Sequence, residues 1–199
     1  MRTTLIAAVL ATSLGAPAVA DDPVAVVEFT GATATRSGGE VADTRYSEKA
    51  DDAVINGREF ADGIVTYTGQ VGMGKGSAWA GIGLNVNIQP QAKPMDASKY
   101  KSVTFRLAAS PEGNLRLRVI GPEEKIRNAG CYPIVTQAVK KDVKEYTIPL
   151  SQFASEGWCG GNSRAVQKVL PELVGFEVAD IQMRKAPTSL SVGSITLNP

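Results

Sequence analysis

The segment Ala78–Ile88 has the residue pattern that most strongly suggests a ligand-binding surface. Its apolar side chains alternate with polar or small ones, which predicts a strand with one buried face. On the face opposite the apolar side chains, Gly81 and Gly83 are expected to leave the floor of the sheet open, so that a flat ligand can approach the backbone. Trp79 is equally compatible with ligand contact and with a place in the core, because buried tryptophans are common in β-sandwiches. The face opposite the apolar residues carries Trp79, Gly81, Gly83, Asn85 and Asn87.

Three arginines extend this candidate binding surface. Arg106 and the pair Arg116 and Arg118 point outward from two further predicted strands, opposite apolar residues. The alternation does not say whether they share a sheet with Trp79, and ordinary solvated arginines are the alternative. Aromatic rings stack on the apolar faces of sugars, while amide and guanidinium groups pair with sugar hydroxyls. These residue types together therefore favour a carbohydrate ligand.

The two cysteines, Cys131 and Cys159, add a second aromatic region. In an oxidising compartment, a small even number of cysteines predicts a disulfide, and two buried thiols are the alternative. Tyr132 follows Cys131 and Trp158 precedes Cys159, so the bond would bring both rings into one neighbourhood. The two rings form either a stacking platform for a ligand or a cover over the disulfide.

The chain contains no histidine, which removes the commonest general base and metal ligand. Ser-His-Asp and Cys-His nucleophilic schemes and His-ligated zinc or copper sites are therefore excluded. A glycosidase would need two carboxyl groups about 5 to 9 Å apart across a cleft. We predict that the protein is not an enzyme, because no spacing singles out an acid and a base. The candidate carboxylates are Glu28, Asp52, Glu145, Glu177 and Asp180.

The glycine-rich segment Gly69–Gly76 nearly matches a phosphate-binding loop. The residue after Lys75 is Gly76, whereas a phosphate-binding loop has a serine or threonine there to hold magnesium. No helix is predicted to follow. We therefore interpret the segment as a glycine-rich hairpin loop.

The start of the chain has the pattern of a secretory signal peptide. Arg2 supplies the positive charge, Leu5–Leu14 is apolar, and Ala18 and Ala20 form the small-x-small pattern of a cleavage site. The apolar stretch is shorter than the about 20 residues that span a bilayer. A buried N-terminal helix is the alternative interpretation. We predict a signal peptide over residues 1–20, cleaved after Ala20, and a periplasmic or secreted protein.

The composition of the remaining chain argues against two kinds of partner. The sequence has 21 Lys and Arg against 20 Asp and Glu, and Arg2 is the only charged residue of the leader, so its removal leaves no net charge. Nucleic-acid-binding domains usually carry a basic excess. No second apolar segment reaches transmembrane length. We therefore expect neither nucleic-acid binding nor membrane insertion.

Short apolar and β-branched runs, separated by Gly, Pro, Asn and Asp, predict an all-β fold. One buried and one wet face per strand is typical of antiparallel sheets, so we predict a two-sheet antiparallel β-sandwich, or jelly roll. The polar segment Gly31–Asp52 is expected to be a long loop, and helical turns are expected at Ser151–Phe153 and Arg164–Leu170. The predicted strands are Val24–Phe29, Gly63–Thr68, Ala78–Ile88, Lys101–Ala108, Leu115–Ile120, Val143–Leu150, Leu173–Ile181 and Leu190–Leu197.

Several motifs follow one another in a recognisable order: Trp79–Leu84, Asp96–Arg106, Leu115–Val119, Val143–Phe153 and Val192–Leu197. This order resembles the galactose-binding-like jelly rolls that include family 11-type carbohydrate-binding modules and CIA30-type domains. The resemblance implies one domain over residues 21–199 that binds β-glucans or related polysaccharides in a groove of aromatic and polar side chains. It also implies a structural calcium in many members, and no other cofactor. This chain departs from the pattern at Gly193 and Ser194, where the family usually has an acidic residue.

We therefore predict an exported, non-catalytic domain that binds a polysaccharide or other glycan. A protein-interaction or assembly domain of CIA30 type is one alternative, and it would show an exposed apolar patch. A jelly-roll carbohydrate-active enzyme is the other, and it would need a carboxylate pair or a Tyr/Arg/Lys cluster in a cleft. The residues expected to contact the glycan are Trp79, Asn85, Asn87, Arg106, Arg116, Arg118, Tyr132 and Trp158.

Overall fold

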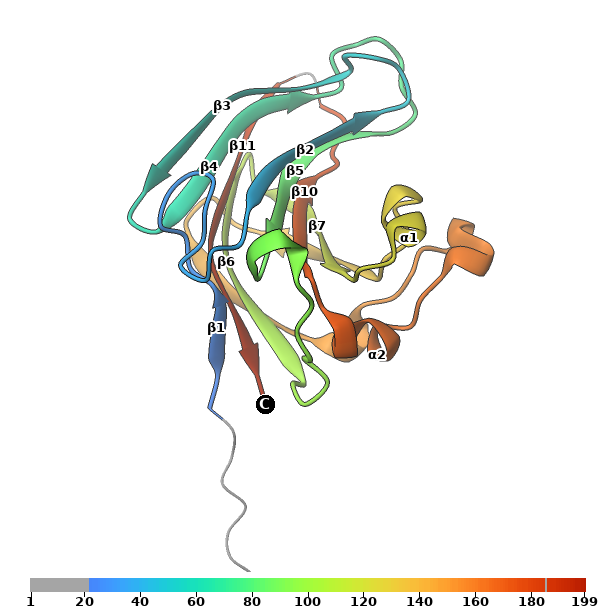
Figure 1. Ribbon diagram of the computed structural model, residues 1–199. Coiled ribbons are helices and arrows are strands. Elements are labelled where there is room, and N and C mark those ends of the chain that lie inside the picture. Colours follow the sequence, from blue (N-terminus) through green and yellow to red (C-terminus); the bar gives the residue numbers. More distant parts are fainter. Residues whose placement is uncertain (1–21, 185) are drawn as a thin grey trace, which may run out of the picture.

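The computed structural model describes residues 22–184 and 186–199, so the predicted leader lies outside the described residues. Within them, eleven strands form two antiparallel sheets that pack against each other (Figure 1). This arrangement confirms the predicted two-sheet antiparallel β-sandwich.

The two sheets differ in size, and their strand orders interleave along the chain. The six-stranded sheet has the order β3 (Ala53–Ala61), β4 (Ile64–Val71), β11 (Pro187–Asn198), β6 (Ser102–Ser110) and β9 (Lys144–Pro149), with β1 (Val24–Val27) also paired to β11. The five-stranded sheet has the order β2 (Val41–Ser47), β5 (Ala80–Asn87), β10 (Gly175–Asp180), β7 (Gly113–Ile120) and β8 (Ile134–Val139).

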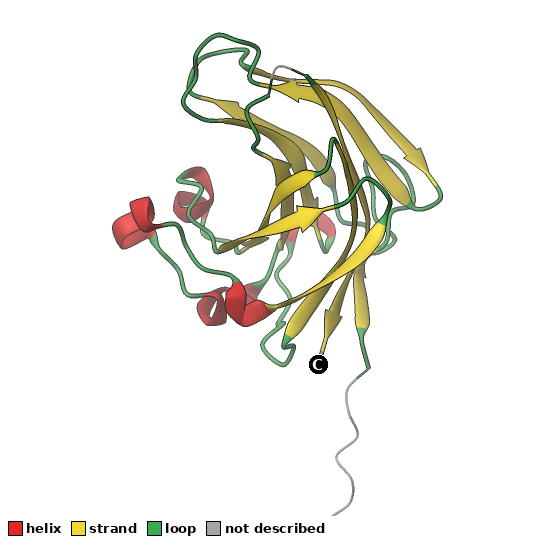
Figure 2. Cartoon of the chain, turned by 180° about the vertical axis from the view of Figure 1, so that it is seen from behind, coloured by secondary structure: helices red, strands yellow, loops and turns green. Residues whose placement is uncertain are grey.

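Short helices and turns gather mainly on one side of the sandwich (Figure 2). The predicted helical turns near residues 151–153 and 164–170 are present. In the described part of the chain, no helix is long and apolar enough to cross a membrane. The helical elements are α1 (Glu124–Asn128), α2 (Val166–Val169) and 3-10 turns at Pro90–Ala92, Leu150–Gln152, Gly157–Asn162 and Leu170–Glu172.

The core lies between the sheets and is built from the alternating apolar positions that the sequence predicts. Phe105 of β6 and Phe176 of β10 meet edge to face across the two sheets, with ring centroids 5.5 Å apart. The apolar face predicted for the strand around β5 is buried throughout. Burial of these side chains is the main force that holds the sheets together. It leaves the opposite face of each sheet free to carry polar groups.

Three strands that the sequence did not predict, β2, β3 and β8, are all edge strands. An edge strand is exposed along one side and often on both faces, so its apolar alternation is weak. The expectation of a long loop over Gly31–Asp52 is wrong, because β2 lies within it. The glycine-rich segment is no hairpin either, since it connects β4 and β5, which belong to different sheets.

The disulfide Cys131–Cys159 is present, as predicted. It joins the residue that follows the α1 region to the 3-10 turn Gly157–Asn162, across a sequence separation of 28 residues. Both cysteines are buried. The bond therefore ties two surface segments that share no sheet pairing.

Loss of this disulfide is expected to lower the free energy of unfolding by about 3 kcal/mol, because closing a loop of this length restricts the unfolded chain. Denaturant unfolding of wild type and of Cys131→Ser/Cys159→Ser measures this difference. Reductant should shift the wild-type midpoint toward that of the double variant and leave the double variant unchanged. Equal midpoints for the two proteins without reductant would contradict the prediction.

Candidate functional site

A groove of about 1130 Å³ lies over the outer face of the five-stranded sheet. Its floor consists of side chains from β2, β5, β10 and β7. One wall is the Trp79 loop, residues 72–79, which connects β4 to β5. The other wall is α1 together with the Trp158 loop, residues 155–164, on the right-hand side of Figure 1. Trp79 and Trp158 are 54% and 65% exposed, so each wall presents a free indole ring to the groove.

The floor has a polar row at its centre, set by the register of three neighbouring strands. Asn85 of β5 pairs with Glu177 of β10, and Glu177 pairs with Arg118 of β7. Asn87 of β5 also lines the groove, one position beyond this row on the same strand face. These residues face the groove because the alternate positions of the same strands are fixed in the core.

The Arg118–Glu177 pair at the centre of the floor is buried and only partly satisfied. Arg118 Nη1 donates to Glu177 Oε2 at 2.6 Å, and the two side chains are 8% and 6% exposed. Glu177 Oε1 and Arg118 Nε are buried and have no hydrogen-bond partner within the described part of the chain. Buried polar atoms of this kind are costly unless another group satisfies them. Both atoms lie below the accessible surface, so the pair forms the buried base of the floor, and the half-buried amides of Asn85 and Asn87 are the polar groups that the floor presents to a ligand.

Tyr46 of β2 forms part of the floor beside Trp79. The ring centroids of Tyr46 and Trp79 lie 6.4 Å apart. A Cβ atom on Gly81 would lie 2.6 Å from Tyr46 Cζ, so the ring lies directly over this glycine. The prediction of open floor at Gly81 is therefore wrong, and the glycine makes room for Tyr46. Burial raises the pKa of Tyr46 to about 12, against the opposing effect of the Arg116 guanidinium, so the phenol keeps its proton.

Arg116 of β7 lies between Tyr46 and the Trp158 loop. Its Nη2 donates a hydrogen bond to the Tyr46 hydroxyl, and its guanidinium carbon lies 5.3 Å from the centroid of the Tyr46 ring. Its Nη1 lies 3.4 Å from Glu156 Oε2. Its Nε is buried without a hydrogen-bond partner among the described residues.

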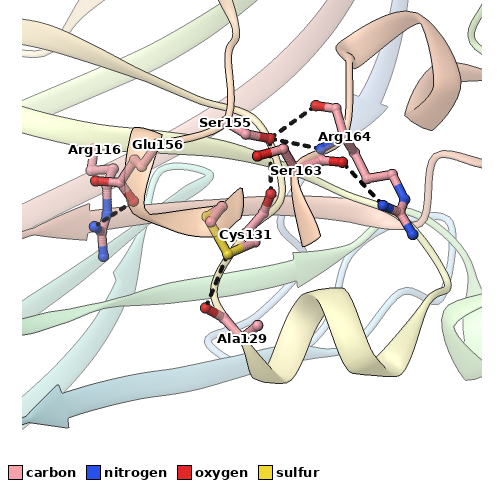
Figure 3. Close-up of a disulfide and its surroundings, with 8 residues drawn as sticks. Arg116, Ala129, Cys131, Ser155, Glu156, Ser163 and Arg164 are labelled. Atoms are coloured by element: carbon pink, nitrogen blue, oxygen red, sulfur yellow. Dashed lines mark hydrogen bonds and ion pairs between the residues drawn. A yellow bond between two sulfur atoms is a disulfide. The ribbon is translucent and has the colours of Figure 1, made fainter. Parts of the chain in front are cut away.

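The Trp158 loop is anchored on both sides of its tryptophan (Figure 3). Cys159 is bonded to Cys131, and the Ser155 hydroxyl lies 3.0 Å from the Cys131 carbonyl oxygen. The Ser155 hydroxyl also accepts a hydrogen bond from the Arg164 backbone N–H at 2.9 Å. These contacts hold the loop against the end of α1 while Trp158 itself stays exposed.

The Trp79 loop is held by the buried side chain of Asp52. Asp52 Oδ1 accepts from the Lys75 N–H at 3.1 Å, and Oδ2 accepts from the Ser77 N–H at 2.9 Å. The hydrogen bonds from Ser77 are the main cause that lowers the pKa of Asp52 to about 2. Three glycines of the loop, Gly72, Gly74 and Gly76, have φ of 80°, 87° and 79°, which side chains rarely adopt. The loop conformation therefore depends on both its glycines and an ionised Asp52.

Asp52 is expected to make the stability of the protein depend on pH in the acid range. Its pKa falls from 3.8 to about 2 on folding, so its contribution is complete above pH 4 and is lost as the pH falls toward 2. Asp52→Asn should lower the melting temperature at pH 7 by several degrees and flatten its dependence on pH between 4 and 2. Melting curves from pH 7 to pH 2 measure both effects. Asp51→Asn, which changes an 84% exposed carboxylate, is the matched control and should follow the wild type.

Six of the predicted contact residues come together in the groove, whereas Arg106 lies on the other sheet. The groove contains Trp79, Asn85, Asn87, Arg116, Arg118 and Trp158. Arg106 belongs to β6 of the six-stranded sheet, opposite Glu145 of β9, and its stem lies over Gly193 of β11. The prediction that Arg106 shares a groove with Trp79 is therefore wrong. Alternation shows that a side chain points outward but does not show from which sheet.

Tyr132 borders the groove but offers no free face for stacking. Its side chain is 2% exposed, its ring lies against Gly121, and its hydroxyl donates to the Glu123 carbonyl at 3.2 Å. The prediction that Tyr132 is part of a stacking platform is therefore corrected. Tyr132 is buried within the wall, whereas Trp158 is 65% exposed.

The sequence pattern does not single out Tyr46 or Glu156 as groove residues, and it singles out Glu177 only as one of several carboxylates. Tyr46 lies in a polar segment whose composition predicts a loop, and a single aromatic ring among charged residues does not indicate a strand. Glu156 lies two residues before Trp158, and this proximity was the one available signal. Glu177 alternates with Phe176 and Val178, which predicts that it points away from the core.

The described residues do not fit the structural calcium that the family resemblance implies. Residues 22–184 and 186–199 contain no group of three or more carboxylate or thiol side chains that could hold a metal ion. At Gly193, where this chain lacks the acidic residue usual in the family, the backbone lies against the aliphatic part of the Arg106 side chain. A cationic side chain beside this position disfavours a bound cation.

The two-sheet architecture is the fold of solved β-sandwich carbohydrate-binding modules. A family 11 carbohydrate-binding module from Clostridium thermocellum, in complex with a β-1,3-1,4-mixed-linked tetrasaccharide, matches with a TM-score of 0.59 and 12% identity over 90% of this chain and 97% of that chain. The family 11 module of the cellulosomal cellulase Lic26A-Cel5E from the same organism matches with a TM-score of 0.60 and 11% identity, over 91% and 97% of the two chains.

The same fold also occurs within larger chains. An exo-β-agarase matches with a TM-score of 0.52 and 13% identity over 88% of this chain, which corresponds to 25% of the agarase. No family model and no curated protein matches the sequence. At these identities the likeness establishes the fold, and the function has to be argued from the groove.

Proposed function

We propose that the protein is an exported, non-catalytic carbohydrate-binding protein that holds a polysaccharide in the groove between Trp79 and Trp158. The observation that carries this proposal is the combination of two exposed indole rings with a floor that presents the half-buried amides of Asn85 and Asn87. Indole rings stack on the apolar face of a pyranose. Each amide can donate to one sugar hydroxyl and accept from another, so one ligand class can use both the rings and the floor. The fold shared with carbohydrate-binding modules supports the same function.

Export is supported by the pattern of the first 20 residues and by the disulfide. The protein is then placed in the periplasm or outside the cell, where polysaccharides are accessible. The neutral overall charge of the exported chain, predicted from the sequence, fits an uncharged ligand better than a polyanion.

The groove distinguishes this function from the two alternatives. An assembly domain would present a continuous apolar patch, whereas the floor between the exposed Trp79 and Trp158 includes the polar side chains Asn85, Asn87 and Arg116. A glycosidase would need a free acid and a free base. The two carboxylates of the groove, Glu156 and Glu177, are each ion-paired with an arginine.

Affinity electrophoresis of residues 21–199 on a panel of polysaccharides, followed by calorimetry on those that retard it, tests this function. The panel includes mixed-linkage β-glucan and agarose, because proteins that share the fold are named for them. We expect dissociation constants in the micromolar to millimolar range, on the order of those that a few stacking and hydrogen-bond contacts give. Failure to be retarded by any polysaccharide would contradict the proposal.

The same polysaccharides are expected to survive prolonged incubation with the protein without release of reducing sugar. Sustained release that is abolished by Glu177→Gln would identify the groove as a catalytic site instead. Glu112→Gln, which changes an exposed carboxylate outside the groove, is the matched control for that comparison.

A further inference from the structure

A single arginine side chain, Arg116, contacts the Trp158 wall directly and is linked to the Trp79 wall through Tyr46. Toward the Trp79 loop, its guanidinium is bonded to Tyr46, whose ring lies 6.4 Å from that of Trp79. Toward the other wall, its Nη1 lies 3.4 Å from Glu156, two residues before Trp158. The Arg116 side chain is 13% exposed, so these contacts are largely shielded from solvent. A continuous chain of contacts therefore runs from one tryptophan wall to the other.

The strands between Arg116 and Tyr46 are shaped to let these side chains meet. Arg116 lies on β7 and Tyr46 on β2, three strand spacings apart, or about 14 Å. The Arg116 row runs through Ala179 of β10 and Gly83 of β5 to Thr44 of β2, and Tyr46 lies two positions along β2, opposite Gly81. A Cβ atom on Gly83 would lie 2.8 Å from the Cβ of Ala179. Because Ala179 and Gly83 have little or no side chain, they leave a shallow depression in the floor. The side chains of Arg116 and Tyr46 lie across this depression.

We propose that Arg116 is a positioning residue that couples the Trp79 and Trp158 walls and thereby sets the width of the groove. Its planar guanidinium serves this role because it can donate in two directions at once while stacking on the Tyr46 ring. Lysine carries the same charge as a point and cannot make these contacts together. Insofar as the proposed carbohydrate function holds, the same residue decides whether a polysaccharide with side branches fits between the walls.

The two tryptophans of the chain, Trp79 and Trp158, allow the coupling to be measured without any ligand. A ¹⁵N–¹H spectrum contains one indole cross-peak for each, assigned with Trp158→Phe. Glu156→Ala removes the Arg116 partner on the Trp158 wall, and we expect it to shift the cross-peak of Trp79 on the opposite wall. Arg116→Lys should shift the same cross-peak.

Glu123→Ala is the matched control, because it removes the other ion pair of the Trp158 loop, Arg164–Glu123 at 2.7 Å. This pair has no contact with Tyr46, so the Trp79 cross-peak should stay in place. If Glu156→Ala moves only the Trp158 cross-peak, the walls are independent and the proposal is overturned. Melting curves of each variant identify any that are unfolded, and Glu156→Gln, which keeps an acceptor for Arg116, then replaces Glu156→Ala.

The effect on ligand choice is measured with a linear mixed-linkage β-glucan and with branched xyloglucan. For Arg116→Lys, we expect the ratio of the two affinities to change by about tenfold, because the groove width is no longer fixed. An equal loss for both polysaccharides would mean that Arg116 only contacts the sugar, and would overturn its role in specificity. If no polysaccharide of the panel binds the wild type, the carbohydrate function fails, while the spectra still decide whether the walls are coupled.

Discussion

Trp79→Ala is expected to weaken polysaccharide binding by at least about 30-fold, because tryptophans at the centre of a binding site commonly contribute 2 kcal/mol or more. Its melting temperature should stay within about 2 °C of the wild type, since exposed side chains contribute little to folding stability. The side chain is 54% exposed, and its ring lies beside that of Tyr46. Calorimetric titration with the polysaccharide that binds the wild type, run beside thermal melts, gives both values.

Two further variants make this result specific to the groove. Trp158→Ala should lose binding to a similar degree, because its ring is 65% exposed on the opposite wall. Phe60→Ala removes an aromatic ring that is 38% exposed on β3, outside the groove, and should bind as the wild type does. A loss of about 3–5 kcal/mol of stability in Trp79→Ala, as for a core aromatic residue, would contradict the assignment of Trp79 to the site.

The second large effect concerns the buried pair Arg118–Glu177. Arg118→Met is expected to cost about 3–5 kcal/mol of folding free energy, because it leaves the Glu177 carboxylate buried without its partner. The double variant Arg118→Met/Glu177→Leu should regain most of that stability, since well-packed apolar side chains replace a buried ion pair at little cost. It should nevertheless bind the polysaccharide more weakly, because the charged pair beside Asn85 in the floor is gone. Denaturant unfolding and calorimetric titration of the three proteins measure these effects.

An exposed ion pair provides the control for this series. Lys140 and Glu112 lie 3.1 Å apart with side chains that are 62% and 51% exposed. Lys140→Met should change the free energy of unfolding by less than about 1 kcal/mol, because water screens exposed pairs. If the Arg118→Met/Glu177→Leu variant binds as tightly as the wild type, the pair has no part in ligand recognition and the proposed floor of the site is wrong.

The two parts of the groove that these predictions test, the tryptophans and the charged pair, are held in place in different ways. The tryptophans lie on loops that are held by other residues, Asp52 for one loop and the disulfide for the other. They are therefore free to be exposed. The charged pair lies within the sheet, where neighbouring strands determine its position. A site with rigid polar groups in its floor and aromatic rings on anchored loops can orient a sugar chain without rearranging on binding.

The local sequence pattern was sufficient to predict much of the fold. Alternation in β5, β6 and β7 identified the buried face of each strand, because side chains of a strand point to opposite sides in turn. The two cysteines were sufficient for the disulfide, since two residues allow one pairing. The same alternation placed Trp79, Asn85 and Asn87 on one face, where the structure has them lining the groove.

The alternation of side chains does not show which strands pair with each other. Strand pairing determined the rest of the site. Arg106 and Arg118 have the same local pattern, yet β6 pairs with β11 in one sheet and β7 pairs with β10 in the other. Tyr46 joins the floor because the edge strand β2 pairs with β5, although its sequence is too polar to indicate a strand. Strand pairing is decided by contacts between residues far apart in the chain, which bury apolar surface together, and no local spacing records them. The sequence by itself thus determined which side chains point outward, and only the tertiary structure decided which of them meet.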